Sequence, residues 1–166
     1  PPMLMEPSYS TSVPETPREI SQTRTPVRQV TIMVPNAVGT LLQLAKSLHE
    51  HQVEILGISL QDTVEATQVR MILSDVSAGE KALASLGYSA ILHEVIVIEL
   101  QEVSRGFCKA LSALLEAELN LQHCYSLMIH DSVMGFLVLV LDDLQIGIEF
   151  LTKAGFKVLS QDELSR

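Results

Sequence analysis

The sequence predicts an α+β fold made of two tandem copies of one small unit, because the chain repeats itself. An alternating, strand-like segment is followed by a turn, an apolar helical segment and a second strand-like segment, and this succession occurs twice. The same offset along the chain relates Gly39 to Arg105 and Ile55 to Leu121. A repeat of this length is typical of a small folded module and is too long for a solenoid unit.

The composition fits packed layers of sheet and helix. Hydrophobic residues make up 47% of the 166 residues, whereas aromatic residues make up only 4% and tryptophan is absent. Branched aliphatic side chains of this kind fill the space between a sheet and its helices. Because modules of about 65 to 70 residues bury a limited fraction of their surface alone, we expect the two copies to pack on each other or on another chain.

The first copy has the order β-α-β-β-α-β. Alternation or β-rich composition predicts strands at residues 29–34, 53–60, 67–73 and 89–93. Apolar residues at helical spacing predict a first helix over residues 38–50. A second helix is predicted to begin at Ser77, which forms a capping-box pattern with Glu80, and to end at Gly87.

The second copy repeats this order. Strands are predicted at residues 95–100, 120–128, 135–141 and 156–159, with a turn at residues 130–132. A helix over residues 104–117 is expected to bury a stripe made of Phe107, Ala110, Leu111 and Leu114. Asp143 is expected to cap a helix that runs through Lys153. The continuously apolar segment at residues 137–141 predicts a strand buried on both faces.

The order β-α-β-β-α-β predicts an antiparallel sheet with both helices on one face, the ferredoxin-like arrangement. The chain therefore divides into two ferredoxin-like modules in tandem, at residues 28–94 and 95–166. The other face of each sheet is left open, so either a further layer covers it or the face is polar. Residues 1–27 hold six of the seven prolines and no apolar periodicity, so we expect a disordered tail there.

The charge and hydropathy argue against two classes of partner. The net charge is −9 and the pI is about 4.9, so a phosphate backbone would be repelled and we expect no nucleic-acid partner. No apolar stretch approaches the roughly 20 residues that span a bilayer, and the N-terminus lacks a signal-peptide pattern. We therefore expect a cytoplasmic protein that has no membrane association.

Nothing in the sequence predicts a metal, a cofactor or a catalytic residue. Cys108 and Cys124 lack metal-ligand or disulfide spacing, and we expect two small buried residues in a reducing compartment. His49 and His51 do not share a helix face. Phosphate loops, nucleophile elbows and zinc helices are also missing from the sequence, so we do not expect an enzyme.

Several stretches, each weak alone but in the same order in both copies, resemble the ACT domain, the amino-acid-sensing module of many metabolic enzymes. They are VEILGISL at residues 53–60, HEVIVIEL at 93–100, NLQHCY at 120–125 and AGFKVL at 154–159. The arrangement over residues 28–164 resembles stand-alone bacterial proteins that contain two ACT modules. The resemblance implies a free amino acid bound between paired modules, held by the loop after the first strand and by the start of the second strand.

By position, the resemblance implies a set of ligand-binding residues. They are Asn36, Val38, Gly39 and Thr40 in the first loop, Glu102, Arg105 and Gly106 in the second loop, and Glu54 and Asn120 at the starts of the second strands. The residues also allow plainer roles. Asn36 fits a turn residue, Asn120 fits a helix C-cap, and Arg105 fits a solvated side chain. Arg105 departs from the family pattern, which usually has a Pro-Gly pair in this loop.

The sequence thus predicts a non-catalytic regulatory protein that binds an amino acid between its modules. The alternative is a ligand-free interaction module that acts as a regulatory subunit of a metabolic enzyme, which the lost Pro-Gly pairs favour. A homodimer is expected in either case, because small modules and exposed sheet edges both favour further pairing.

Overall fold

The computed structural model describes residues 24–129 and 133–165. Two expectations from the sequence therefore lie wholly or mostly outside the described residues. The turn at residues 130–132 is not described, and neither is the expected tail up to residue 23. Residues 24–27 are described, and Val27 is a fully buried strand residue.

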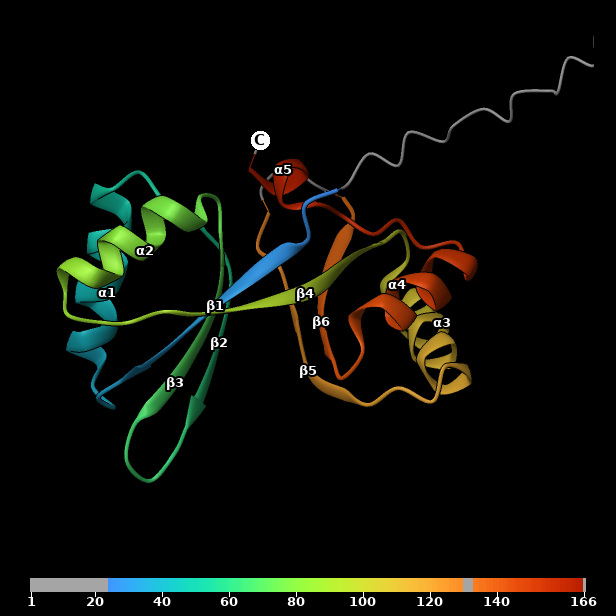
Figure 1. The fold of residues 1–166 in the computed structure, drawn as a ribbon, viewed down its shortest axis with the longest axis horizontal. Coiled ribbons are helices and arrows are strands. Elements are labelled where there is room, and N and C mark those ends of the chain that lie inside the picture. The colour runs from blue at the N-terminus through green and yellow to red at the C-terminus, as the bar shows by residue number, and fades with distance from the viewer. Residues whose placement is uncertain (1–23, 130–132, 166) are drawn as a thin grey trace, which may run out of the picture.

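The elements follow the predicted α+β order, and Figure 1 shows their arrangement. The strands are β1 (Val27–Val34), β2 (Ile55–Asp62), β3 (Thr67–Leu73), β4 (Ile91–Leu100), β5 (Leu121–Ser126) and β6 (Gly135–Leu141). The helices are α1 (Val38–Glu50), α2 (Val76–Ser85), α3 (Val103–Glu116), α4 (Leu144–Lys153) and α5 (Gln161–Leu164). The strands form one sheet in the order β2-β3-β1-β4-β6-β5, and every neighbouring pair is antiparallel.

Strand β4 belongs to both halves of the molecule. Residues 91–95 pair with β1, whereas residues 96–100 pair with β6. The sequence analysis expected separate strands at residues 89–93 and 95–100. They form one strand because no glycine or proline interrupts residues 91–100. We call β1–β3 with α1 and α2 the first half, and β5 and β6 with α3–α5 the second half. The module division at residues 94 and 95 stays a prediction.

The last predicted strand, at residues 156–159, is reduced to a single bridge. Val158 pairs with Ile98, and the flanking backbone bonds run from Glu99 N to Lys157 O (3.2 Å) and from Leu159 N to Val97 O (2.8 Å). The pairing stops there because Ser160 caps the short helix α5 immediately afterwards. The segment still occupies the position beside β4 that the predicted strand would have taken.

Helices α1 to α4 cover the outer faces of the sheet, and the two inner faces cover each other (Figure 1). Helices α1 and α2 pack with Ile32 and Met71, and helices α3 and α4 pack with Ile98 and Leu139. A third cluster lies between the two inner faces of the folded-over sheet and joins the first half to the second. We call this cluster the inter-sheet core. Its members include Leu56 and Ile72 from the first half, Val138 from the second half, and Val97 from β4. The faces expected from the sequence to be open are therefore buried against each other.

The two edge strands of the sheet meet where the sheet folds over. The backbone N–H of Met128, just beyond β5, donates to the carbonyl of Leu56 in β2 (2.6 Å). A register shift between Ile55 and Gly57 bends β2 at this point, and the absence of a side chain at Gly57 leaves room for Leu127. The contact joins the two edge strands at this one point, and only there is the edge less available to another chain than the sequence indicated.

The local predictions have mixed outcomes. Asp143 caps α4, since its carboxylate accepts from Ile146 N (3.1 Å). The prediction that Ser77 caps the second helix is wrong, because Asp75 accepts from Ala78 N (3.0 Å) and the helix starts one residue before Ser77. Burial on both faces is confirmed for residues 137–139, whereas Val140 and Leu141 are half-buried. Leu139 faces the helices and Val138 lies in the inter-sheet core.

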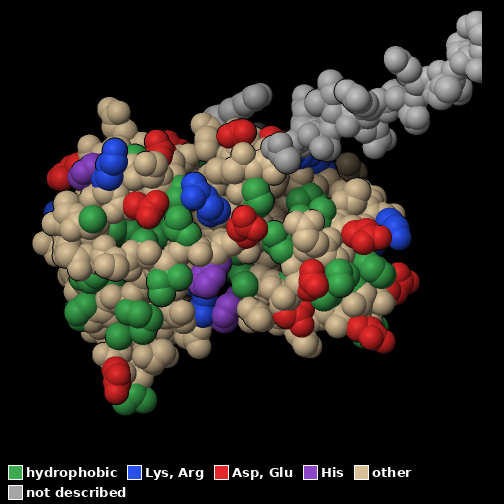
Figure 2. Space-filling model, viewed as in Figure 1, with side chains coloured by type: hydrophobic (Ala, Val, Ile, Leu, Met, Phe, Trp, Pro, Cys, Tyr) green, Lys and Arg blue, Asp and Glu red, His purple; other side chains and the backbone are tan. Residues whose placement is uncertain are grey.

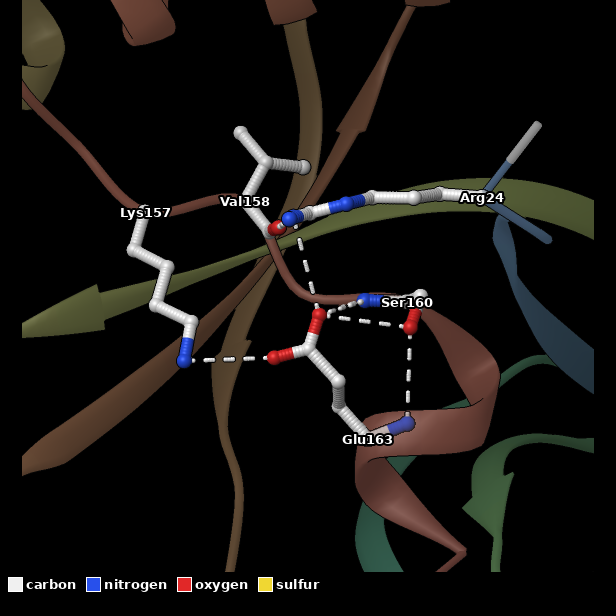
Figure 3. Close-up of polar contacts among 5 residues, drawn as sticks. All are labelled: Arg24, Lys157, Val158, Ser160 and Glu163. Atoms are coloured by element: carbon white, nitrogen blue, oxygen red, sulfur yellow. Dashed lines mark hydrogen bonds and ion pairs between the residues drawn. The ribbon is translucent and has the colours of Figure 1, made fainter. Parts of the chain in front are cut away.

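A C-terminal clip (residues 157–165) fastens the second half to the first, and Figure 3 shows the polar contacts within it around Glu163. Gln161 N donates to Thr25 O (3.0 Å), the Gln161 amide donates to Leu73 O (3.2 Å), and Ser165 Oγ donates to Ser74 O (2.7 Å). Glu163 holds the clip together. Its carboxylate forms ion pairs with Lys157 (3.2 Å) and Arg24 (3.7 Å) and accepts from Ser160 N (3.3 Å).

The charge of Glu163 should make the clip sensitive to acid. Partial burial acts to raise the pKa of Glu163, but hydrogen bonds from Lys157 and Ser160 outweigh it and hold the pKa below its ordinary value. The Glu163 carboxylate therefore binds a proton more readily in the unfolded chain than in the folded protein. The stabilisation is complete above the unfolded carboxyl pKa of about 4.3, and it is lost as pH falls through the lower pKa of the folded protein.

Accordingly, Glu163→Gln should lower the free energy of unfolding by about 1 kcal/mol at pH 7 and by less at pH 3. Urea denaturation at the two pH values checks this expectation. The matched control is Glu149→Gln, which removes an exposed ion pair with Lys153 (3.4 Å) and should have little effect at either pH. An equal loss at both pH values in Glu163→Gln would contradict the electrostatic role.

Candidate functional site

The predicted site residues lie in four separate places within one chain. Asn36 lies in the short loop between β1 and α1, whereas Val38, Gly39 and Thr40, which were expected in that loop, form the first turn of α1. The Asn36 amide donates to the carboxylate of Asp62 (2.9 Å) at the end of β2. Val38 is 84% exposed, and the space around Gly39 is open. This loop thus presents an amide that already bonds a carboxylate.

Glu54 lies at the opposite end of the first half. Its backbone N–H donates to Ser74 Oγ (2.8 Å), and its side chain is exposed. Glu54 lines a cavity of about 910 Å³ together with Met128 from the second half and Glu163 and Ser165 from the clip. The start of the second strand therefore opens onto a junction of both halves, but the first loop does not reach it.

Asn120 lies just before β5, at the far end of the second half. Its backbone N–H and its side-chain amide both donate to the carboxylate of Asp142, at 3.2 and 3.3 Å. Asn120 follows Glu118 and Leu119, which close α3 by backbone bonds to Leu115 and Leu114. As with Asn36, the amide is used for a contact within the chain. Ligand contact by Asn36, Glu54 or Asn120 stays a prediction.

The second loop is the part of the predicted set that lies in a well-defined pocket. Glu102, Arg105 and Gly106 line a cavity of about 550 Å³, which we call the Arg105 pocket. Its other lining residues are Glu99, Gln101, Lys109, Gly155, Phe156 and Lys157. The pocket lies between the end of β4, the first turns of α3 and the segment before the clip, so three separate stretches of chain build it.

Both signs of charge meet in the Arg105 pocket. Arg105, Lys109 and Lys157 supply three cations, and Glu99 and Glu102 supply two carboxylates. Arg105 Nε lies 3.7 Å from the carboxylate of Glu102, and the two side chains are 82% and 65% exposed. An exposed ion pair of this kind has little net stability. Arg105 is therefore free to exchange Glu102 for another carboxylate.

Two glycines and an aromatic ring shape the walls of the pocket. Gly155 has φ +92, a conformation that favours glycine, and it turns the chain from α4 into the segment beside β4. Phe156 forms the apolar wall, and Lys109 Nζ lies 5.3 Å from the centre of its ring. Lys109 lies one helical turn after Arg105, so helical spacing could have paired them. Gly155 and Lys157 follow α4 in the sequence, far from Arg105 along the chain, and only the fold brings them to the pocket.

A cluster of polar side chains lies between the two halves of the folded sheet. The Tyr125 hydroxyl donates to the Gln29 amide oxygen (2.7 Å), and Arg70, which is 5% exposed, donates to the side-chain oxygens of Gln61 and Gln68. Burial and the positive charge of Arg70 lower the pKa of His123. Burial raises the pKa of Tyr125 against the opposing influence of Arg70. Figure 2 shows histidine and basic side chains gathered near the middle of its face.

The two cysteines differ from the expectation. Cys108 and Cys124 are both free and exposed, because Cys108 lies on the outer side of α3 and Cys124 on the edge strand β5. Within residues 24–129 and 133–165, no three His, Cys, Asp or Glu residues come together in a metal-binding arrangement. The same described residues contain no helix that is both long and apolar enough to cross a membrane.

Comparison with known families identifies the fold. The model of the ACT domain pair matches residues 25–166. The chain belongs to the ACT domain pair family. Among curated protein sequences, none matches this chain. The predicted resemblance and the α+β fold of two ferredoxin-like ACT modules are therefore confirmed.

Solved structures share this fold at low sequence identity. A protein from Bacteroides thetaiotaomicron has a TM-score of 0.77 at 19% identity, covering 86% of this chain and 98% of its own. The ligand-free regulatory subunit of aspartate kinase from Thermus thermophilus has a TM-score of 0.56 at 15% identity, covering 78% and 93%. The corresponding subunit from Thermus flavus has a TM-score of 0.52 at 13% identity, covering 79% and 94%.

Proposed function

We propose that this ACT domain pair is a non-catalytic, cytoplasmic regulatory protein that binds a free amino acid in the Arg105 pocket. The observation that carries the proposal is the meeting of both charge signs at one pocket of about 550 Å³. A free amino acid carries a carboxylate and an ammonium group a few bonds apart. Its recognition therefore requires neighbouring groups of both signs, together with space for a side chain.

The pocket suits each part of such a ligand. The Arg105 guanidinium offers paired donors to the α-carboxylate, and Lys109 and the first turn of α3 add positive potential. The carboxylates of Glu99 and Glu102 suit the α-ammonium group. The missing side chain at Gly155 leaves room beside Lys109 in the pocket, and Phe156 offers an apolar wall. The ligand carboxylate would take the place of Glu102 beside Arg105.

Lys157 gives the pocket a connection to the rest of the molecule. It lines the pocket and also forms the 3.2 Å ion pair with Glu163 in the clip. A ligand carboxylate that draws Lys157 toward the pocket would weaken this ion pair. The bound and free proteins would then differ in how firmly the clip holds the two halves. The ligand would then bind more tightly to the state with the loosened clip. A regulatory signal requires such a difference in ligand affinity between two states.

Ligand screening with matched variants tests the site. A binding amino acid at one hundred times its dissociation constant should stabilise the folded protein by about 2.7 kcal/mol, which a thermal-shift assay detects. Arg105→Ala and Lys109→Ala should each weaken binding by about tenfold or more, because each removes a charged hydrogen-bond donor. Lys46→Ala, an exposed lysine on α1, is the control and should bind normally.

A second measurement separates this site from any other. The amide of the amino acid that binds lacks the carboxylate, so it should not stabilise the protein at the same concentration. A flat response to all twenty amino acids, or a response that survives Arg105→Ala, would contradict the proposed site. Either outcome would favour the second candidate function, a ligand-free regulatory subunit of a metabolic enzyme. The observation that favours it is the exposed apolar face of α3, where Phe107 and Leu111, which were predicted to be buried, are 38% and 37% exposed.

A further inference from the structure

Arg70 is a buried cation without a carboxylate partner. It is 5% exposed, and among the described residues it is the only charged side chain that is buried. Its Nη2 donates to the amide oxygens of Gln61 (3.0 Å) and Gln68 (2.7 Å), which carry no charge. The ion pairs of the described residues join more exposed side chains, and none includes Arg70. Since a buried charge is costly without a counter-charge, an anion is expected beside Arg70.

Part of the Arg70 guanidinium still faces solvent. A guanidinium has five N–H donors, of which Nη2 supplies two. Nε and Nη1 have no hydrogen-bond partner among the described residues. Within residues 24–129 and 133–165, the one side-chain nitrogen or oxygen that is both enclosed and unpartnered is Arg28 Nε, so these donors of Arg70 are accessible from outside. Gln61, which is exposed, can also turn away and release a donor of Nη2.

Strand alternation places further donors, but no acidic residue, around this guanidinium. Thr31 of β1 and Ser59 of β2 are the cross-strand neighbours of Arg70, so the three side chains form one row on the inner face. His123 points toward the row from β5, on the same side as Tyr125, and burial and the charge of Arg70 both lower its pKa. The inner-facing residues of β1, β2, β3 and β5 include no Asp or Glu. Figure 2 shows histidine and basic side chains beside a hollow near the middle of its face.

The internal repeat shows that the fold does not require a cation at this position. When β3 and β6 are aligned at their last residues, Arg70 corresponds to Val138, which is fully buried in the inter-sheet core. The cross-strand neighbours of Val138 are Val97 and Tyr125, in place of the two hydroxyl-bearing neighbours of Arg70. A largely apolar row thus fills the second copy. The charge in the first copy is not needed for packing, which indicates a functional role.

We propose that the row around Arg70 is a binding site for a small oxyanion, held by Arg70, the His123 ring and the Ser59 hydroxyl. Each of these groups can donate a hydrogen bond, and a guanidinium forms a strong, charge-assisted pair with an oxyanion. The shared chemistry is that of a carboxylate or a phosphate group. Because Arg70 and Ser59 belong to the first half and His123 to the second, the bound anion would link the halves. Other residues build the Arg105 pocket, and the proposal does not depend on amino-acid binding there.

Nuclear magnetic resonance titration of the whole chain with inorganic phosphate and with acetate tests the site at constant ionic strength. Because ligands of a few atoms bind weakly, each anion is added up to about 50 mM. At least one of them should shift the backbone amide signals of Ser59 and His123 with saturation, and the one that does so identifies the group as phosphate or carboxylate. Arg70→Met should abolish these saturable shifts. Lys81→Met, which changes an exposed lysine of α2, is the control and should retain them.

A second variant keeps the test decisive. Arg70→Met is expected to fold, because replacing a buried charge by an apolar residue is often neutral or stabilising. If it does not fold, His123→Leu takes its place and should weaken binding by about tenfold, since it removes one donor to the anion. The proposal would be overturned if neither anion gave saturable shifts, if the shifts at Ser59 survived Arg70→Met, or if His123→Leu bound the anion as the wild type does.

Discussion

Replacing Gly57 by valine is expected to lower the free energy of unfolding by about 3 kcal/mol, because the new side chain has no room. A Cβ atom at position 57 would lie 2.6 Å from Leu127 Cδ2 and 3.5 Å from both Ser126 O and Tyr125 Cε2. The Cβ atom meets Ser126 O and Tyr125 at ordinary contact distances, so the overlap arises at Leu127 and from the two methyl groups that valine adds beyond Cβ. Relief would require β2 to move from the end of β5 and would strain the bond from Met128 N to Leu56 O.

Urea denaturation followed by circular dichroism measures the loss at Gly57. The control is Gly39→Val, since a Cβ atom at Gly39 meets no atom within 4 Å and should change the free energy by less than about 1 kcal/mol. If both variants unfold at the wild-type urea concentration, the meeting of the two edge strands does not contribute to stability. A loss of similar size in both would point to glycine itself and not to the contact.

Local features of the fold were predictable because short stretches of sequence determine them. The helical spacing of Leu44 and Leu48, the cap at Asp143 and the continuous apolar run at residues 137–141 each act within a few residues. The wrong prediction that Ser77 caps α2 also concerns a feature that a few neighbouring residues determine. Asp75 lies two residues earlier and is an equally good cap, and the pattern of Ser77 with Glu80 does not exclude it.

The way the halves pack was not predictable, because it depends on residues far apart. The alternation of β3 shows that Ile72 points away from the helices but not what covers it. Val138, in the other copy of the repeat, supplies that contact only after the sheet folds over. The fusion of two predicted strands into β4 has a similar origin, since the switch of partner between Val95 and Ile96 leaves no mark in the sequence.

The candidate site shows the same limit. Family positions indicated the start of α3 that contains Arg105, and helical spacing could have added Lys109. Lys157 could not be connected to them, because it reaches the pocket through the pairing of its segment with β4. Conversely, Asn36 and Asn120 fit the family positions well, yet their amides bond Asp62 and Asp142. Sequence position identifies the type of side chain but not the partner it finds.

The two halves should unfold as one unit, and Ile72→Ala tests this most directly. Ile72 is fully buried in the inter-sheet core, so its truncation should lower the free energy of unfolding by about 2 to 5 kcal/mol. Since the cavity would lie between the sheets, amide hydrogen exchange should speed up in β6 as well as in β3. The control is Val64→Ala at the fully exposed turn between β2 and β3, which should alter neither strand.

The distribution of the exchange effect decides between two descriptions of the molecule. If the halves were independent modules joined only by β4, Ile72→Ala would accelerate exchange in β3 and leave β6 at the wild-type rate. Equal acceleration in both strands would mean that the inter-sheet core makes one cooperative unit. In that case a ligand in the Arg105 pocket, which lies wholly in β4 and the second half, would stabilise the first half as strongly as the second. That coupling is what a sensor built from two packed modules requires.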